Sequence, residues 1–264
     1  MKIGIIGSLG VVGNACKEGF KSIGNSVFEH DLVLNSSIDD VLQTDIIYIA
    51  VPSPSRDDGS CDTTIVENLI DDLFKKKFSG TIAIKSTVEP GTTKRLINKY
   101  SQKICFVPEF LKERSAKEDF LKHGTLIIGS QNEESIKIVK KSHGILPEKT
   151  ISMEPTEAEM VKYFHNIFNA MRVVFANEIF EICQNESIDY ENVLMGALER
   201  NDYTDRYLKV NKDLRGYAGV CLPKDTKALA AYCKKNNLPL KLFENIEQSN
   251  EKLKKTVFKN MRKS

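Results

Sequence analysis

The chain has 264 residues, enough for one large domain or for two ordinary domains with hydrophobic cores of their own. Lysine and arginine number 38 and aspartate and glutamate 36, so the net charge of +2 gives no electrostatic reason to expect binding to nucleic acid or a membrane surface. The longest apolar run, residues 46–52, is too short to span a bilayer. The six cysteines include no C-x-x-C pair, which argues against a zinc or redox motif and fits a reducing cytoplasm.

The N-terminal residues have the pattern of a nucleotide-binding strand–turn–helix unit. Residues 2–6 predict a short buried strand, a glycine turn follows, and a helical pattern runs to about Ile23. Gly10 and Gly13 fit the last two positions of a dinucleotide fingerprint, whereas Gly7 fits the first only if the turn carries one extra residue. Such a turn lets backbone N–H groups reach a pyrophosphate at a helix N-terminus, although glycine turns also serve packing.

An acidic residue, Asp31, follows the second predicted strand, residues 26–30. It lies about 20 residues past the glycines, where a ribose-binding carboxylate is expected. A carboxylate there accepts the ribose 2′-OH and repels a 2′-phosphate, so it favours NAD over NADP. The alternative is an ordinary surface aspartate, but together with the glycine turn the functional interpretation is preferred.

Strands and helices continue to alternate along the first half. We predict further strands at residues 45–51, 81–84, 104–107 and 126–128 and a helix at 62–77. This alternation predicts an α/β fold with a Rossmann-like, doubly wound parallel sheet, whose ligands bind at the carboxyl ends of the strands. The loops 51–54, 85–93 and 108–113 follow such ends. Thr87 and Glu109 are their better functional candidates, and turn chemistry is the alternative for each loop.

From about residue 155 the pattern becomes helical, so we place an NAD-binding domain at 1–154 and an all-helical domain at 155–264. Apolar residues at helical spacing predict one long central helix over residues 157–183, with shorter helices after Asp189 and from about Asp225 and Leu240. Lys162 and Asn166 lie four apart on one face of the long helix. They either present two donors to a developing oxyanion or form a solvated pair.

A lone thiol, Cys221, lies in the segment 219–225, between a glycine that permits close backbone approach and a proline that fixes the following turn. A thiolate needs positive charge nearby, and the segment contains a lysine. Asp225 can handle a proton or a water if the chain turns into a helix there. The segment alone also fits a buried structural cysteine.

An ordered series of motifs resembles the UDP-glucose/GDP-mannose dehydrogenase family. The family patterns V-x-T-P, K-S-T-V-P-P-G-T-T, P-E-F-L-R-E, A-E-x-x-K-x-x-x-N, N-E and G-F-G-G-x-C-L-P-K-D are similar to residues 51–54, 85–93, 108–113, 158–166, 177–178 and 216–225. Two departures stand near the chemistry: the first fingerprint glycine, and Ala218 in place of a glycine. The resemblance also implies a short form that lacks the family's C-terminal nucleotide-sugar-binding domain.

The resemblance implies NAD-dependent oxidation of the C6 primary alcohol of a nucleotide sugar such as UDP-glucose, with two NAD per turnover. Cys221 would form a thiohemiacetal and then a thioester, and Lys162 and Asn166 would stabilise the oxyanion. Asp225 and Thr87 would position water, and Glu109 would assist hydrolysis. The cofactor would contact Gly7, Leu9, Gly10, Val11, Val12, Asp31, Val51, Pro52, Ser53, Thr87 and Glu113. The substrate would contact Glu109, Phe110, Leu111, Glu113, Lys162, Asn166, Arg206, Arg215 and Gly219. A homodimer through the long helix is expected.

Two other functions stay open. A short β-hydroxyacid dehydrogenase also joins a Rossmann domain to a helical one and uses a lysine and an asparagine four apart, but it needs no cysteine. Cys221 and the loop 108–113 therefore argue against it. The other alternative is a non-catalytic NAD-binding or assembly subunit, whose missing domain is supplied by a partner or has been lost.

Overall fold

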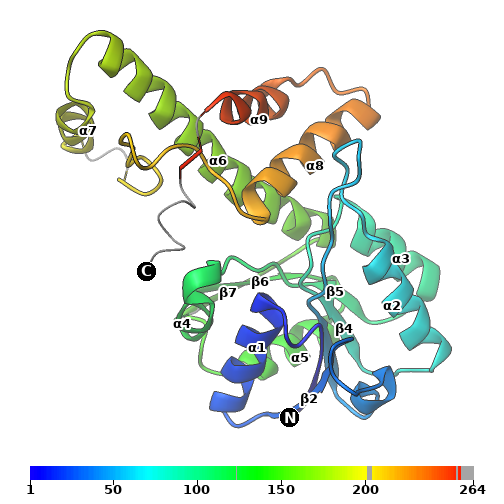
Figure 1. The fold of residues 1–264 in the computed structure, drawn as a ribbon. Helices are drawn as coiled ribbons and strands as arrows, with labels where there is room; N and C mark the ends of the chain where they lie inside the picture. Colours follow the sequence, from blue (N-terminus) through cyan, green and yellow to red (C-terminus); the bar gives the residue numbers. More distant parts are fainter. Residues whose placement is uncertain (123, 201–203, 254, 257–264) are drawn as a thin grey trace. The chain divides into compact units, whose positions relative to one another are not determined.

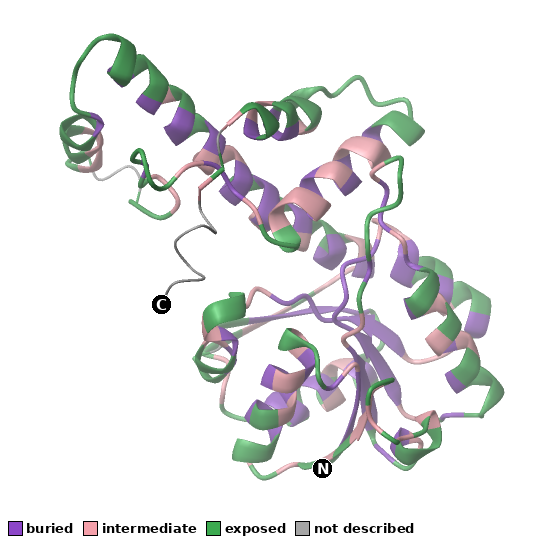
Figure 2. Ribbon diagram, in the orientation of Figure 1, coloured by how far each residue is buried: buried purple, intermediate pink, exposed green. Residues whose placement is uncertain are grey.

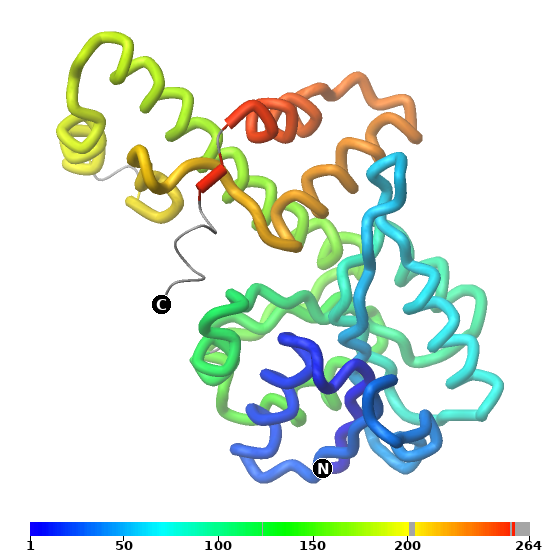
Figure 3. The backbone as a smooth tube through the Cα atoms, viewed as in Figure 1, coloured from blue at the N-terminus to red at the C-terminus, as the bar shows by residue number. Residues whose placement is uncertain are grey.

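The computed structural model describes residues 1–122, 124–200, 204–253 and 255–256. The chain, traced as a tube in Figure 3, forms two compact units. The first unit comprises Met1–Pro54 and Cys61–Lys162, and the second comprises Ser55–Ser60 and the chain from Tyr163 onward. The division into functional domains at residues 154 and 155 stays a prediction, and residues 257–264 of its second part lie outside the described residues.

The first unit is built on a seven-stranded sheet with the order β2-β1-β3-β4-β5-β6-β7. The strands are β1 (Lys2–Ile6), β2 (Ser26–His30), β3 (Ile46–Ile49), β4 (Thr81–Ile84), β5 (Ile104–Phe106), β6 (Thr125–Gly129) and β7 (Lys149–Met153). Neighbouring strands are parallel except β5 and β6, which pair antiparallel. The predicted Rossmann-like α/β fold is confirmed, with a mostly parallel rather than wholly parallel sheet.

Helices cover both faces of this sheet (Figure 1). One hydrophobic cluster joins the strands to α2 (Thr64–Lys75) and α3 (Thr92–Tyr100), and another joins them to α1 (Val11–Ser22), α4 (Ala116–Leu121) and α5 (Glu133–His143). The 3-10 turns η1 (Ile38–Val41) and η2 (Glu113–Ser115) lie in connections. The central strands β3 and β4 are buried along their whole length (Figure 2), as expected for parallel strands that are covered on both sides.

The second unit is helical. The long helix α6 (Pro155–Asn185) begins in the first unit and continues into the second, where α7 (Tyr190–Leu198), α8 (Cys221–Lys235) and α9 (Leu242–Lys252) follow. The predicted long central helix and helical second half are therefore confirmed. A cluster that includes Ala176, Phe180 and Tyr190 packs α6 against α7, and α8 lies against α9. No helix in the described parts of the chain is both long and apolar enough to cross a membrane.

The start of α8 differs from the sequence prediction. The helix was expected from about Asp225 with Pro223 fixing a turn before it, but it begins at Cys221. Pro223 is therefore the third helical residue, a first-turn position where a missing N–H costs no intrahelical hydrogen bond. Cys221 and Asp225 consequently lie one turn apart on the same helix face.

Candidate active site

The glycine turn after β1 requires two of its glycines for internal packing. Gly7 has φ +85°, and a Cβ there would lie 2.5 Å from the carbonyl oxygen of Ala50. A Cβ on Gly13 would lie 2.0 Å from the carbonyl oxygen of Gly7. Gly7 thus makes the tight turn and Gly13 allows the helix to approach the strand, which are the roles of the first and third fingerprint glycines.

Gly10, in contrast, has no neighbour within the protein that demands glycine. It is exposed, and a Cβ there would make only ordinary contacts of 3.5 and 3.9 Å. It precedes α1 without a side-chain cap, so the first N–H groups of that helix, on Val11 and Val12, have no capping side chain. A backbone left uncovered at a helix N-terminus fits a bound pyrophosphate, so these residues are suited to hold the diphosphate of NAD.

Asp31 lies beside this turn, as the sequence predicted. Its Oδ2 accepts a hydrogen bond from the Leu9 N–H at 3.0 Å, and its Oδ1 accepts one from the Val33 N–H at 3.2 Å. The first bond links residues 22 positions apart. The carboxylate is therefore fixed next to the glycine turn, where it can accept hydrogen bonds from a ribose.

Two of the predicted ligand loops are joined to each other at the ends of β3 and β4. The Ser86 hydroxyl donates to the Val51 carbonyl at 2.7 Å, and the Cys61 thiol donates to the Thr87 carbonyl at 3.4 Å. Ser53 and Thr87 are both buried, whereas Pro52 is exposed. The structure therefore brings the segments 51–53 and 85–87 together at one edge of the sheet.

A buried ion pair, not predicted from the sequence, connects Lys85, the residue after β4, to the loop after β5. Lys85 Nζ lies 3.1 Å from Glu109 Oε2, and the two side chains are 0% and 6% exposed. Burial opposes the charge on Lys85, but the Glu109 carboxylate outweighs it and raises the pKa of the lysine. Glu109 Oε1 accepts hydrogen bonds from the Phe110 and Leu111 N–H groups at 2.7 and 3.1 Å, so the carboxylate also shapes its own loop.

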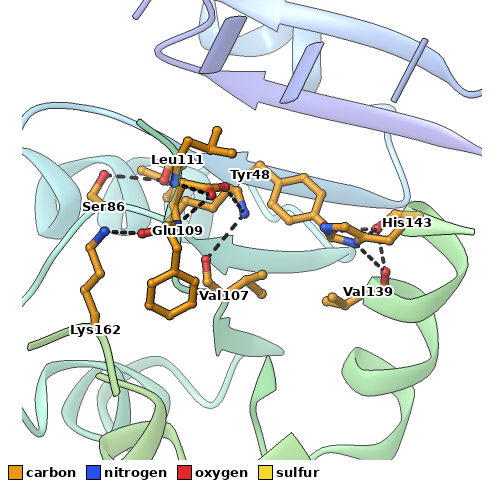
Figure 4. A network of polar contacts seen from close by, with 12 residues as sticks. Tyr48, Ser86, Val107, Glu109, Leu111, Val139, His143 and Lys162 are labelled. Carbon is orange, nitrogen blue, oxygen red and sulfur yellow. Dashed lines mark hydrogen bonds and ion pairs between the residues drawn. The ribbon is translucent and has the colours of Figure 1, made fainter. Parts of the chain in front are cut away.

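Lys162 reaches the same loop from α6. Its ammonium donates to the Glu109 carbonyl oxygen (Figure 4). It also lies 5.4 Å from the centre of the Phe110 ring. The structure therefore brings together Glu109, Phe110, Leu111 and Lys162, four residues that the sequence assigned to one site. Glu113, in η2, is exposed, and none of these contacts involves it.

A second buried carboxylate organises the candidate residues of the second unit. Asp225 is 0% exposed. Its Oδ2 accepts a hydrogen bond from Asn166 Nδ2 at 2.5 Å, and its Oδ1 lies 3.0 Å from Lys224 Nζ. The pairing of Asn166 with Asp225 agrees with their assignment to one site. Lys224 was quoted in the motif but was not assigned a role.

Cys221 is an exposed cysteine, whereas the other five are buried. It is the first residue of α8, where the aligned peptide dipoles favour an anion. Gly219, two residues earlier, has φ +87° and so needs glycine. Ala218 is not among the residues with positive φ, so alanine is compatible with the backbone at that departure from the family pattern.

The two predicted substrate arginines differ in their surroundings. Arg206 is exposed, with its guanidinium 5.5 Å from the centre of the Tyr207 ring. The Arg215 side chain is only 12% exposed, and its guanidinium binds Asn177 and Glu181 of α6. The contacts of Arg215 are therefore made within the second unit.

Glu159 is a further residue without a predicted role. It is buried, and its two carboxylate oxygens accept hydrogen bonds from the Gly91 N–H at 2.6 Å and the Thr93 N–H at 2.8 Å. It therefore caps α3 and fixes the end of the loop 85–93. Burial raises the pKa of Glu159. The sequence signal was its place in the A-E-x-x-K pattern.

Comparison with known families agrees with this geometry. The model of the UDP-glucose/GDP-mannose dehydrogenase family NAD binding domain matches residues 22–145, and that of the central domain matches residues 156–252. The chain belongs to the UDP-glucose/GDP-mannose dehydrogenase family. The first match confirms NAD as the expected cofactor, and together the two matches cover most of the chain.

Individual relatives support the assignment. A UDP-glucose 6-dehydrogenase of Rickettsia bellii is 30% identical over 234 residues, which are 84% of this chain and 53% of the relative. A UDP-glucose dehydrogenase structure from Pyrobaculum islandicum superposes with a TM-score of 0.86 at 26% identity and covers 95% of this chain and 68% of the other. The chain spans about half the length of the curated relatives it matches.

The fold is also similar to that of a Mycobacterium tuberculosis 3-hydroxyisobutyrate dehydrogenase. That structure has a TM-score of 0.76 at 12% identity and covers 94% of this chain and 91% of its own. At such low identity the likeness shows a shared fold alone.

Proposed function

We propose that the chain carries out NAD-dependent oxidation of the C6 primary alcohol of a nucleotide sugar to a carboxylate. The observation that carries the proposal is the exposed Cys221 at the start of α8, one turn before a buried Asp225 that is bonded to Asn166. A β-hydroxyacid dehydrogenase needs no such cysteine. We propose the residues up to 154 as the cofactor domain and those from 155 as the catalytic domain.

The residues of the first unit would hold the cofactor. Gly7, Leu9, Gly10, Val11 and Val12 would contact the diphosphate, and Asp31 the adjacent ribose. The rest of the cofactor would contact Val51, Pro52, Ser53, Thr87 and Glu113. Bound NAD would supply the oxidising power by accepting a hydride in each of two oxidations.

Cys221 would act as the nucleophile between the two oxidations. The thiolate would form a carbon–sulfur bond to the aldehyde carbon, giving a thiohemiacetal whose oxidation leaves a thioester. Water would then break the carbon–sulfur bond, so that the carboxylate leaves and the thiolate returns. The overall change consumes one alcohol, one water and two NAD, and it yields one carboxylate, two NADH and three protons.

Donors on α6 would stabilise the oxyanion that forms when sulfur attacks. Lys162 and Asn166 lie one turn apart on that helix, and each already donates to a protein acceptor: Lys162 to the Glu109 carbonyl and Asn166 to Asp225. We propose that both also donate to the sugar oxygen. Asp225 and Thr87 would position the hydrolytic water, and Glu109 would assist hydrolysis.

Substrate recognition would use residues of the loop 108–113 and residues of the second unit. We propose Phe110, Leu111, Glu113, Gly219 and an arginine, Arg206, as contacts for the sugar nucleotide. A homodimer would use the outer face of α6, on which Phe164 and Phe175 are 74% and 60% exposed. The cytoplasmic location stays a prediction.

The test is the stoichiometry of NADH with a panel of substrates. The chain is incubated with NAD and UDP-glucose, GDP-mannose or N-acetylated UDP-sugars, and NADH and carboxylate are both quantified. We expect two NADH per carboxylate with one of these sugars. The yield should be lost in Cys221→Ser but kept in Cys233→Ala, which alters a buried cysteine of the same helix.

Other outcomes favour the alternatives. One NADH per molecule of a simple hydroxyacid, unaffected by Cys221→Ser, would indicate a β-hydroxyacid dehydrogenase. NAD binding without turnover of any substrate would indicate a non-catalytic subunit.

A further inference from the structure

The loop from Arg215 to Val220 leads directly into Cys221, and its first three residues are held from two helices. On the α6 side, Asn177 is 1% exposed, and its Oδ1 accepts hydrogen bonds from the Arg215 Nε–H at 2.7 Å and from the Gly216 N–H at 3.3 Å. Arg215 also donates to Glu181, one turn further along the helix. A single asparagine oxygen therefore fixes both a side chain and the backbone of the loop.

The Arg215 guanidinium is held from a second direction. It lies 4.7 Å from the centre of the Phe180 ring, so the cation is in contact with the ring face as well as with Asn177 and Glu181. Three neighbours on one helix, at positions 177, 180 and 181, fix this side chain. The Arg215 side chain is therefore anchored to α6 through two hydrogen bonds and one ring contact.

On the α9 side, Asn250 forms two hydrogen bonds with the backbone of Tyr217. Asn250 is 0% exposed, its Oδ1 accepts the Tyr217 N–H at 2.9 Å, and its Nδ2 donates to the Tyr217 carbonyl at 3.1 Å. The Tyr217 hydroxyl donates to Glu247 Oε2 at 2.7 Å. Both backbone polar groups and the side chain of Tyr217 are therefore bound to α9.

Gly216, between Arg215 and Tyr217, allows both sets of contacts to form. Gly216 has φ +66°, and a Cβ there would lie 3.0 Å from Asn250 Oδ1. Beyond the fixed base, the loop turns outward: Gly219 and Val220 are exposed, with Val220 at 72%. The base of the loop is thus held by hydrogen bonds to α6 and α9, and Cys221 follows its exposed end.

We infer that Asn177, Arg215 and Asn250 are positioning residues that set the placement of the Cys221 thiol through the backbone of residues 215–217. Arg215 would then act on the reaction through the loop and not by touching the sugar nucleotide. The importance of the thiol placement for turnover rests on the proposed function. The placement itself does not.

The test measures the thiol directly. The full chain, without NAD or sugar, is treated with iodoacetamide, and the alkylation rate of Cys221 is followed by peptide mass spectrometry. Arg215→Met keeps an unbranched apolar side chain against Phe180 but removes every donor, and Asn250→Ala removes both hydrogen bonds between Asn250 and Tyr217. Losing hydrogen bonds of this kind should change the Cys221 alkylation rate roughly 3- to 10-fold in either direction.

The matched control is Arg95→Met. Arg95 forms a bidentate pair with Glu67 in the first unit, so this variant also loses an arginine–glutamate contact. We expect it to leave the alkylation rate of Cys221 unchanged, even where the melting temperature falls as much as in Arg215→Met. Arg215→Lys, which keeps one cation, should restore part of the wild-type rate.

Backbone exchange supplies a second readout. The Gly216 amide should lose protection against hydrogen exchange in Asn177→Ala, and the Tyr217 amide should lose it in Asn250→Ala, because each variant removes the acceptor of that amide. If Arg215→Met does not fold, the alkylation rate of Cys221 and the amide exchange rates are measured in Arg215→Lys instead.

Unchanged alkylation and exchange rates in all loop variants would overturn the inference. The contacts of Asn177, Arg215 and Asn250 would then have a purely structural role. A raised KM for the sugar nucleotide with an unchanged alkylation rate would instead show that Arg215 touches substrate. Because neither thiol nor amide measurement needs turnover, a failure of the proposed function would not affect them.

Discussion

Removing one charge of the Lys85–Glu109 pair should destabilise the first unit far more than removing both. In Lys85→Met the Glu109 carboxylate stays buried without the ammonium that lies 3.1 Å away. In Glu109→Gln the Lys85 ammonium stays buried without a counter-charge 3.1 Å away. Breaking a buried pair in this way costs about 3–5 kcal/mol, because an uncompensated charge remains in a medium that solvates it poorly.

The double variant tests whether the pair acts as a unit. Lys85→Met with Glu109→Gln removes both charges, while the glutamine oxygen can still accept the Phe110 and Leu111 N–H groups. Because neither charge is then left unpaired, the double variant should be more stable than either single variant, so the coupling between the two sites should be at least as large as the cost of one single substitution, about 3–5 kcal/mol. Lys103→Met provides the control, since its pair with Glu134 is exposed and should contribute about 0–1 kcal/mol.

Urea unfolding followed by circular dichroism gives the free energies for the four proteins of the cycle. Glu109 raises the pKa of Lys85 in the folded protein. The contribution of the lysine to the unfolding free energy is therefore complete below the ordinary lysine pKa, and it is lost only as the pH rises through the raised pKa of the folded protein. The cycle should therefore give the same coupling across the neutral range. Strictly additive single and double variants would refute the reasoning, because two charges in contact cannot be independent.

Two further predictions concern the cofactor turn and the α3 cap. Asp31→Ala should weaken NAD binding about tenfold or more in a calorimetric titration and reduce the preference for NAD over NADP, and an unchanged preference would remove Asp31 from the ribose site. Burial raises the pKa of Glu159, so its contribution to stability is complete below the ordinary glutamate pKa and is lost as the pH rises through the raised folded value. Glu159→Gln should therefore flatten the fall in the unfolding free energy over that window, and an unaltered slope would contradict this assignment.

The features that sequence patterns predicted are those encoded locally. The alternation of apolar runs and helical segments predicted the sheet and the long helix α6, because strand and helix periods are properties of neighbouring residues. Asp31 was placed beside the glycine turn because β1 and β2 are adjacent parallel strands that bring residues 22 positions apart together. The strand β7 was missed, since most of its residues are only partly buried and its run shows no clear alternation.

The features that were missed depend on contacts between distant residues. Nothing near Lys85 in the sequence indicates that its ammonium pairs with Glu109, 24 positions later, across two neighbouring strands. The same holds for Arg215, which the family resemblance assigned to the substrate and whose guanidinium donates to Asn177 on α6. The start of α8 was placed too late because Pro223 reads as a turn residue, although proline is also tolerated in the first turn of a helix.

The most direct test of the account follows the sulfur of Cys221 during turnover. The chain is mixed with NAD and the nucleotide sugar that it oxidises, and the reaction is quenched in acid during steady state. The protein is then digested, and the mass of the peptide that contains Cys221 is measured by mass spectrometry. We predict an added mass equal to the acyl form of that sugar nucleotide, removable by hydroxylamine and absent from Cys221→Ser. Two NADH per carboxylate with no adduct on this peptide, and undiminished turnover in Cys221→Ser, would contradict the account.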